Sequence, residues 1–446
     1  MKLIRNLVCT EIENGFLLFN TLNGLIDAVD QKTVEILGKW INQDAIEPET
    51  PEEQKLYETL GARGYLCVSH EEEQRKKDNL IAKLRALHER DKYKIKALTF
   101  AMTYNCNFRC PYCFESIADD LKGCYISKEQ IDAGLAMAGD DLEHIGLFGG
   151  EPLLPKNREA IAYLIEKAPD KEYDVITNGY YLDQYIDLLS KVKVSYVMVT
   201  LDGKKSVHDK RRFLANGAPT YDKIMENIAL CLRNQIPVRI RMNVDADTLG
   251  EIEELQAHLT DVFADYAPLL SFEISPMMEI KPDERNDLFG KLEEIDAQQA
   301  SPEQKNVFLT RGSPIVNCVL NGGRLTPTYS YCAGHEHGYI VDPLGLIYTC
   351  LVAVGKPRFA VGTYYPEVRF FEQSIKNRNI ETIEKCRSCA YSLLCGGGCP
   401  LKIQEDQSIY QPECSTVLND IHGLLPSLLR ARRGSENGGE RAGASL

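Results

Sequence analysis

The pattern of apolar and polar positions changes twice along the 446 residues of the chain. The first part predicts a hairpin, two helices, a short strand and a charged connector helix, at residues 16–22 with 25–30, 33–40, 52–60, 64–68 and 71–90. The hairpin turn falls at Asn23-Gly24, a dipeptide favoured in such turns. The connector has few apolar positions with which to form a core.

From residue 96 the pattern changes to short apolar strands separated by amphipathic helical segments. The strands are predicted at residues 97–102, 144–148, 175–177, 196–201, 238–244 and 270–274. This alternation is typical of βα units that build a parallel sheet or barrel. After about residue 311 Cys, Gly and turn residues dominate, which indicates a segment held by bound metal more than by a large core. The polar, Gly-rich end of the chain is predicted to be disordered.

Composition narrows the classes of function. The formal charge of −14 argues against a nucleic-acid partner, because phosphate binding needs clustered Lys and Arg. The sequence has no apolar run of about 18 residues and no signal-peptide pattern, so we expect a cytoplasmic protein without a membrane partner. Fifteen cysteines in a reducing compartment favour metal binding or catalysis over disulfides.

Three of these cysteines, Cys106, Cys110 and Cys113, follow the first strand of the βα region. They would lie at the carboxyl edge of the sheet, where loops of α/β folds carry sites. Three thiolates suit an iron-sulfur cube with one open iron, and a zinc loop lacking one ligand is the alternative. The CxxxCxxC spacing resembles the signature of the radical S-adenosylmethionine (SAM) superfamily. The resemblance implies a catalytic 4Fe-4S cluster that binds SAM and cleaves it to methionine and the 5'-deoxyadenosyl radical.

Further motifs lie at the next strand ends. Gly149-Gly150-Glu151-Pro152 resembles the GGEP motif of this superfamily, in which glycines let the backbone approach the SAM amino group. The resemblance assigns SAM contacts to Tyr112, Gly149, Gly150, Glu151, Thr177, Asn178, Asp202, Arg212, Arg241 and Asn243. The TNG and LDG tripeptides taken alone also fit a strand followed by a turn. A structural ion pair between Asp202 and Arg212 is a second alternative.

The C-terminal cysteines have a spacing that resembles the SPASM domain of radical SAM peptide maturases. The resemblance assigns Cys318, Cys332, Cys350 and Cys399 to a first auxiliary cluster, and Cys386, Cys389, Cys395 and Cys414 to a second. With the catalytic cluster it implies three 4Fe-4S clusters. A zinc knuckle over residues 386–399 is the alternative. Cys318 is the least secure ligand, since members with seven cysteines leave one iron open for a substrate thiolate.

Two features bear on the identity of the substrate: the N-terminal unit, and a residue that differs from the pattern of sulfatase-activating maturases. The N-terminal unit, with its order of hairpin, helix, helix and strand, resembles in topology the winged-helix-like RiPP recognition element. That element binds the leader of a ribosomally made precursor peptide. The alternative is that the unit forms a barrel cap or a dimer contact. Leu351 follows Cys350 where sulfatase-activating maturases have an Asp thought to act as the base. Leu cannot accept a proton, which argues against formylglycine formation unless Asp342 or Glu336 replaces that base.

The resulting prediction is an α/β protein with a partial (β/α)6 radical SAM barrel. Its predicted domains are residues 1–92 (recognition element and linker helix), 93–310 (radical SAM core), 311–424 (SPASM) and 425–446 (disordered tail). The predicted function is oxidative crosslinking of a leader-bearing precursor peptide. Thioether bonds are the first expectation for the crosslink, and carbon-carbon bonds are the close alternative. Flavodoxin or ferredoxin is the expected electron donor. Rival classes are a formylglycine-generating sulfatase maturase, a radical SAM enzyme acting on a metabolite, and a non-enzymatic, zinc-stabilised peptide-binding protein.

Overall fold

The computed structural model describes residues 1–90, 92–115, 121–277, 284–286, 288–292, 307–308, 314–331 and 337–436. Six parallel strands form its centre and neighbour one another in chain order. They are β6 (Ala97–Ala101), β7 (His144–Phe148), β8 (Glu172–Thr177), β9 (Lys193–Thr200), β10 (Val238–Val244) and β11 (Leu270–Pro276). All six predicted strands are therefore present, and the α/β prediction is confirmed.

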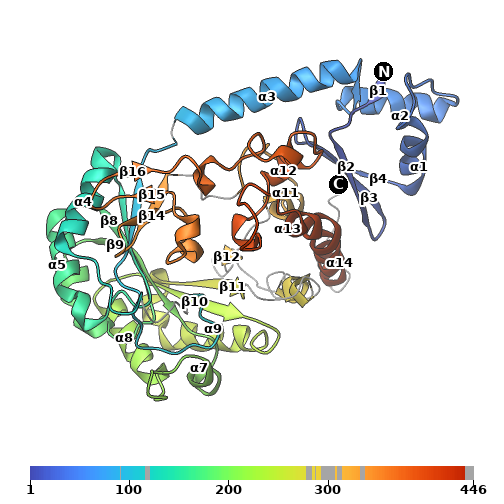
Figure 1. Cartoon of the computed structure of the whole chain (residues 1–446). Coiled ribbons are helices and arrows are strands. Elements are labelled where there is room, and N and C mark those ends of the chain that lie inside the picture. Colours follow the sequence, from blue (N-terminus) through green and yellow to red (C-terminus); the bar gives the residue numbers. More distant parts are fainter. Residues whose placement is uncertain are drawn as a thin grey trace.

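Helices alternate with these strands and cover the outer face of the curved sheet (Figure 1). They are α4 (Lys128–Ala138), α5 (Arg158–Lys167), α6 (Ile186–Leu189), α7 (Lys205–Arg211), α8 (Tyr221–Arg233) and α9 (Glu251–Val262). In α8, Ile224 and Ile228 are one turn apart and fully buried. The strands contribute Leu98, Phe100 and Leu147 to the same core. This core fixes the strand ends from which the candidate site is built.

The sheet continues on both sides with shorter strands. β12 (Val307–Phe308) pairs with β11, while β13 (Gly338–Val341) pairs in parallel with β6. Beyond β13 the pairing is antiparallel, through β14 (Leu346–Tyr348), β15 (Gly362–Thr363) and β16 (Arg369–Phe370). The cysteine-rich segment is thus joined by backbone hydrogen bonds to the strand that precedes the first cysteine loop.

The N-terminal part contains the predicted elements and two strands that were not predicted. In chain order it has β1 (Lys2–Leu3), β2 (Leu7–Ile12), β3 (Gly15–Asn20), β4 (Ile26–Val29), α1 (Gln31–Trp40), α2 (Pro51–Ala62) and β5 (Leu66–Cys67). β2, β3 and β4 form an antiparallel sheet, and β1 pairs with β5. Side chains of Asp30 and Thr50 cap the two helices. Sequence analysis missed β2 although its buried positions alternate.

The connector is the 21-residue helix α3 (His70–Arg90), which runs from the N-terminal part along the C-terminal domain (Figure 1). Contrary to expectation it has a buried stripe. Leu80, Ile81 and Leu84 pack in one cluster with Ile380 and Ile383 of the cysteine-rich segment. α3 is therefore part of a shared core and not a free linker.

The C-terminal domain also contains α11 (Pro314–Leu320), α12 (Ser392–Cys395), α13 (Ser415–Asn419) and α14 (Leu425–Glu436). The expected disordered tail from residue 425 is wrong for α14, because Leu425 and Leu428 are fully buried in a cluster with Val8 and Phe19. Polar residues around this apolar spacing hid it in the sequence. Residues 437–446 lie outside the described residues, and the predicted boundaries at 92/93 and 310/311 stay predictions.

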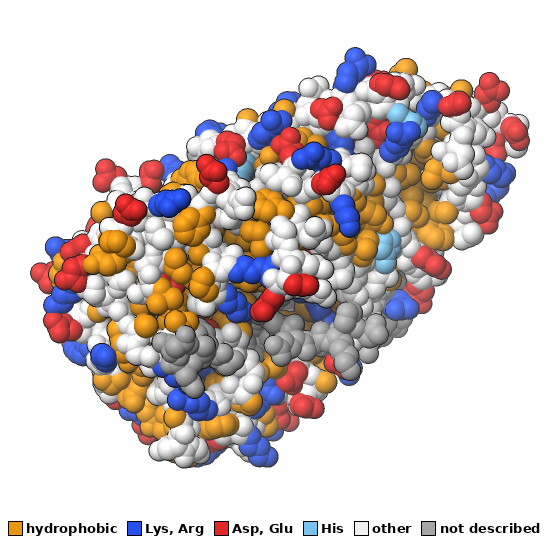
Figure 2. All heavy atoms as spheres, in the orientation of Figure 1, with side chains coloured by type: hydrophobic (Ala, Val, Ile, Leu, Met, Phe, Trp, Pro, Cys, Tyr) orange, Lys and Arg blue, Asp and Glu red, His pale blue; other side chains and the backbone are white. Residues whose placement is uncertain are grey.

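Within the described part of the chain, no helix is both long and apolar enough to cross a membrane. On the face shown in Figure 2, Lys and Arg side chains are interspersed with Asp and Glu side chains. Charges of both signs therefore share the described surface in this view.

Candidate functional site

The three thiols of the CxxxCxxC loop follow β6 at the carboxyl edge of the parallel strands. The loop closes on itself, because the Cys113 N–H donates to the Cys110 carbonyl at 3.2 Å. Burial raises the pKa of all three thiols. Together with nearby negative charges, including those of the other two thiols, it raises the pKa of Cys106 to about 12. Neighbouring buried thiols that oppose one another's ionisation need a cation, and an iron-sulfur cluster fits that need.

The Gly149-Gly150 pair packs against the segment that leads into this loop. The Gly150 N–H donates to the Thr103 carbonyl at 2.9 Å. A Cβ at Gly149 would lie 2.4 Å from the Thr103 oxygen, and a Cβ at Gly150 would lie 2.5 Å from the Asn105 oxygen. The glycines therefore allow two stretches of this chain's own backbone to touch. This reason differs from the expected approach to SAM, which the structure does not test.

Glu151 joins two of the predicted motifs. Its carboxylate is buried and accepts hydrogen bonds from Thr177 Oγ1 at 2.7 Å and from the Asn178 N–H at 2.7 Å. The Asn178 side chain in turn donates to Asn107 Oδ1 at 2.8 Å and to Cys106 Sγ at 3.8 Å. The GGEP and TNG motifs are thus linked to the first thiol through hydrogen bonds.

Tyr112, Asp202 and Arg212 also come together. The Tyr112 hydroxyl donates to Asp202 Oδ2 and accepts from Arg212 Nη1, the latter at 2.8 Å. The ion pair of Asp202 is with Arg211, at 3.3 Å, and the Arg211 guanidinium lies 5.0 Å from the Tyr112 ring centre. The expected alternative of an Asp202–Arg212 ion pair is therefore wrong, since Arg212 reaches Asp202 through Tyr112. Sequence analysis missed Arg211, although it precedes Arg212.

Arg241 and Asn243 share one face of β10, where Arg241 Nε donates to Asn243 Oδ1 at 3.2 Å. The facing residues of β11 complete this group, because Arg241 also donates to Ser275 Oγ at 2.8 Å and lies 3.6 Å from Glu273. The Asn243 N–H reaches Asp202 Oδ1 at 3.4 Å. Glu273 was missed although it lies in the last predicted strand, and Ser275 was missed because that strand was predicted to end at residue 274.

Four C-terminal cysteines form a separate group: Cys386, Cys389, Cys395 and Cys414. Burial and then the charges of Cys389 and Cys414 raise the pKa of Cys386 to about 11. Burial likewise raises the pKa of Cys395 to about 12, with contributions from the other three thiols. The charges of these thiols thus act on one another, and the Cys389 N–H donates to the Cys386 carbonyl at 3.2 Å. They are the set expected for the second auxiliary cluster.

The first auxiliary set is described only in part. Burial raises the pKa of Cys399, and the charge of Cys350 contributes to the increase, so these two thiols are neighbours. Burial alone raises the pKa of Cys318, without a contribution from another described thiol. Cys332 lies outside the described residues, as does Glu336. Of the four predicted ligands of the first auxiliary cluster, the described residues therefore bring together Cys350 and Cys399.

Three consecutive glycines, residues 396–398, join Cys395 to Cys399, and all three have positive φ between 62° and 95°. At residues 396, 397 and 398 respectively, a Cβ would lie 2.4 Å from Ser330 C, 2.4 Å from Ile383 Cδ1 and 1.7 Å from Glu413 O. Each of these atoms belongs to a segment just before a predicted ligand, namely Cys332, Cys386 or Cys414. The glycine run thus lets the cysteine-bearing segments converge.

Arg378 lies between the two cysteine groups, and sequence analysis missed it. Its side chain is 1% exposed and donates to the carbonyls of Gly397 and Gly398, both at 2.6 Å, and to those of Ile409 and Gln411. Burial lowers the pKa of this guanidinium, while nearby thiols of both groups raise it. No sequence signal marks it, because its partners are backbone carbonyls from distant segments.

Asp342 was an alternative base, and its carboxylate has other partners. It accepts from the Tyr104 hydroxyl and from the N–H groups of Leu344 and Leu346, both at 2.9 Å, and it is fully buried. Burial raises the pKa of Asp342. The carboxylate therefore caps a turn and ties it to the segment before the first cysteine loop. Leu351 begins a short helical turn in the same domain.

This geometry defines an α/β protein with a thiol loop at the carboxyl edge of six parallel strands. Residues 100–259 match the sequence model of the radical SAM superfamily. The chain therefore carries a radical SAM domain, and the predictions of a radical SAM fold and of an enzyme are confirmed. This superfamily implies a 4Fe-4S cluster and SAM as cofactors.

Relatives and solved structures extend the comparison. A cysteine-type anaerobic sulfatase-maturating enzyme of Clostridium novyi (strain NT) is 25% identical over 331 residues, which are 66% of this chain and 85% of that protein. The structure of anSMEcpe with bound AdoMet is similar with a TM-score of 0.56 at 18% identity, covering 77% of this chain and 96% of that one. SuiB of Streptococcus suis bound to S-adenosylmethionine has a TM-score of 0.56 at 14% identity, covering 93% and 99%. These likenesses concern the fold.

Proposed function

We propose that this chain is a radical SAM peptide maturase that oxidatively crosslinks a ribosomally made precursor peptide. In this proposal Cys106, Cys110 and Cys113 hold the cluster that cleaves SAM. The SAM contacts are the residues grouped around them: Tyr112, Gly149, Gly150, Glu151, Thr177, Asn178, Asp202, Arg212, Arg241 and Asn243. The eight C-terminal cysteines hold two auxiliary clusters, and the catalytic step acts on a bound peptide.

The observation that carries this proposal is the separation of the described cysteines into a three-thiol loop and two further groups. Three thiols leave one iron open for SAM, whereas a group of four closes its cluster. When bound, the first cluster supplies the electron that cleaves SAM, and the auxiliary clusters accept the electron that crosslinking releases. Joining a peptide thiol sulfur to a peptide carbon removes two hydrogen atoms, so the reaction is an oxidation.

A peptide substrate is supported by the N-terminal part. The likeness to SuiB covers 93% of this chain, a share that cannot leave out all of residues 1–92, and SuiB has been solved bound to the precursor peptide SuiA. Among the described residues β4 pairs only with β3, so its other edge makes no strand pair there. A leader bound there would gain main-chain hydrogen bonds. An external donor such as flavodoxin or ferredoxin would supply electrons.

Formylglycine formation is the second candidate, and the relative from Clostridium novyi favours it. Leu351 offers no base, and the Asp342 carboxylate is enclosed by its turn and Tyr104. We therefore place crosslinking first. A thioether to an acceptor carbon is the leading form of the crosslink, and a carbon-carbon bond is the alternative that the same experiment identifies.

The test uses the anaerobically reconstituted enzyme with SAM, a reductant and a synthetic peptide taken from any short, Cys-rich reading frame that sequencing finds next to its gene. Crosslinking predicts a product lighter by two hydrogen atoms per bond, with tandem mass spectrometry locating a thioether at a Cys. Conversion of a Cys to formylglycine would instead replace the thiol by an aldehyde. Turnover of SAM without any change in the peptide would count against peptide modification.

A matched variant separates catalysis from peptide binding. The Cys106→Ala, Cys110→Ala and Cys113→Ala triple variant is expected to bind the peptide with unchanged affinity and to leave its mass unchanged. The reason is that the triple substitution removes the thiols and not β4 or its surroundings. Fluorescence anisotropy of a labelled leader peptide measures the affinity.

A further inference from the structure

Helix α3 contacts two parts of the molecule with side chains one turn apart. Glu73 faces the N-terminal strands, and Lys77, four residues later, faces the second group of C-terminal cysteines. Residues separated by four positions lie on the same side of a helix. α3 thus brings a charged side chain from the N-terminal part directly to a proposed cluster site.

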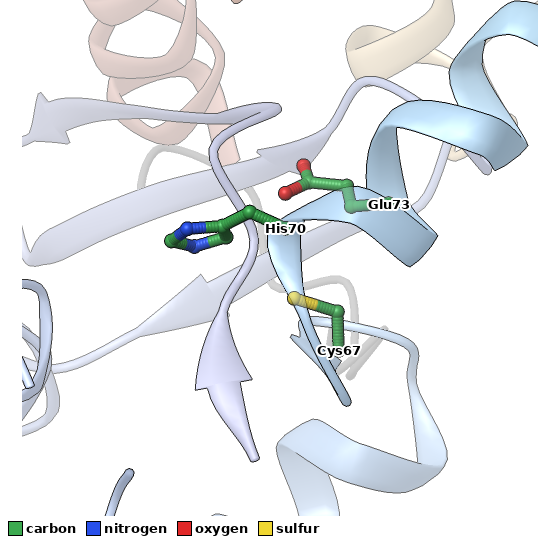
Figure 3. A group of neighbouring side chains, drawn as sticks. All are labelled: Cys67, His70 and Glu73. Carbon is green, nitrogen blue, oxygen red and sulfur yellow. The ribbon is translucent and has the colours of Figure 1, made fainter. Parts of the chain in front are cut away.

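The start of α3 is fixed to the N-terminal strands by three side chains, Cys67, His70 and Glu73, which gather there (Figure 3). Each binds the backbone of residues 2–6. Cys67 Sγ lies 3.7 Å from the Lys2 carbonyl, His70 Nε2 lies 3.1 Å from the Leu3 carbonyl, and Glu73 accepts the N–H groups of Arg5 and Asn6 at 3.0 and 2.9 Å. Because these side-chain atoms contact the backbone of residues 2–6, the three side chains attach the first turns of α3 to that segment.

Lys77 is buried against two backbone carbonyls. Its side chain is 3% exposed, and Nζ donates to the carbonyls of Arg387 and Cys389 at 3.3 and 3.4 Å. Among the described residues no carboxylate oxygen forms an ion pair with it. Burial lowers the pKa of Lys77, while the charges of Cys389, Glu73, Asp78 and Cys386 raise it. A buried ammonium is costly unless negative charge compensates it.

We propose that Lys77 is a positioning residue for the second auxiliary cluster, whose ammonium offsets the negative charge of the ligands Cys386 and Cys389 and raises the reduction potential of that cluster. This inference rests on the proposed cluster at Cys386, Cys389, Cys395 and Cys414. The thiolate ligands leave this site negative, and the Lys77 ammonium at its edge supplies positive charge. The contact also couples the potential to the placement of the N-terminal part.

The sign of the effect follows from charge. Reduction takes one electron from a reductant, here dithionite through redox mediators, and adds one negative charge to a site that is already negative. A nearby ammonium stabilises the reduced form more than the oxidised form. Removing that charge therefore moves the midpoint potential of this cluster to more negative values.

The experiment is an EPR-monitored redox titration of the full chain carrying the Cys106/Cys110/Cys113→Ala substitutions, so that only auxiliary clusters remain. Lys77→Met is expected to move one midpoint to more negative potential by about a tenfold change in the equilibrium constant, which is about 59 mV for one electron. The second midpoint stays in place as an internal control. Lys77→Arg, which keeps the charge, and Lys76→Met, whose side chain is 62% exposed, are expected to leave both midpoints unchanged.

The iron content distinguishes a failure of the role proposed for Lys77 from a failure of the proposed cluster. Unchanged midpoints in Lys77→Met with about eight iron atoms bound would overturn the role of Lys77 and leave the proposed function standing. About four iron atoms or fewer before any change at Lys77, with no further loss of iron on Cys386→Ala with Cys389→Ala, would remove the cluster itself, and the inference would fall with the proposed cluster set. If Lys77→Met loses iron, Lys77→Gln is compared with Lys77→Arg, and equal potentials in these two variants would refute the proposal.

Discussion

The two cysteine regions rest on different supports. The CxxxCxxC loop follows a buried parallel strand, and neighbouring strand ends hold it through the hydrogen bonds of Glu151 and Asn178. The C-terminal cysteines lie on short helical turns and beside the glycine run 396–398. Arg378 lies between the two cysteine groups. The first region is thus a site on a large hydrophobic core, whereas the second lies between two smaller apolar clusters, which include Cys386 and Cys395.

This difference teaches which parts need metal. A loop anchored on a sheet keeps its place without a cluster, because the strands form by burying apolar residues. A segment whose thiols gather from separate turns gains much of its folding energy from the bound metal. The 21-residue helix α3 also packs against the described second cysteine group. Loss of metal should therefore affect the two regions unequally.

The largest expected effect comes from the first region. The Cys106/Cys110/Cys113→Ala variant is expected to lose SAM cleavage and to fall from about twelve to about eight bound iron atoms. Iron and acid-labile sulfide analysis, with chromatography of 5'-deoxyadenosine, measures both quantities. The control, Cys386→Ala with Cys389→Ala, should also lose iron but still cleave SAM. SAM cleavage at the wild-type rate in the triple variant would contradict the assignment of this loop.

Removing iron with a chelator is expected to change the second region far more than the first. Hydrogen exchange followed by mass spectrometry should show amides of residues 386–414 exchanging faster, because the cysteines of this stretch no longer hold its turns together. Amides of β7 and β10 should keep their protection, since these strands are buried in the main core. Equal loss of protection in both regions would show that the sheet also depends on metal.

The same contrast explains what the sequence could reveal. The six parallel strands and the CxxxCxxC loop were predictable, because period-two apolar runs and ligand spacing are local signals. The packing of α14 against β2 was not, since it joins the two ends of the chain. Lys77 and Arg378 were also hidden, because each binds backbone carbonyls of distant residues and the sequence shows only one charge among many.

A smaller effect is expected from the glycine run. Gly398→Ala places a Cβ 1.7 Å from the Glu413 carbonyl oxygen at a residue with φ of 76°, so it should destabilise the C-terminal domain by more than about 2 kcal/mol. Gly217→Ala is the matched control, with φ of 83° and no atom within 4 Å of the added Cβ, and should cost about 1 kcal/mol. Thermal unfolding of the reconstituted variants compares them. Equal losses would mean that the close approach to Glu413 contributes nothing.

The smallest expected effect concerns pH and lies in the first region. His208 is fully buried, and its Nδ1 accepts from the Asp202 N–H at 3.4 Å. The Thr220 hydroxyl donates to the Arg212 carbonyl, so its oxygen accepts from His208 Nε2 at 3.1 Å. Burial and then the charge of Arg212 lower the pKa of His208 from 6.5 to about 3. Between these values the unfolded chain binds a proton that the native protein does not, so stability is lost as pH falls below 6.5. The stability advantage of wild type over His208→Gln should shrink by about 1 kcal/mol between pH 6.5 and about pH 5.5, measured as the change in unfolding temperature. A constant difference across this range would mean that His208 keeps an ordinary pKa and that its contacts with Asp202 and Thr220 do not hold it neutral.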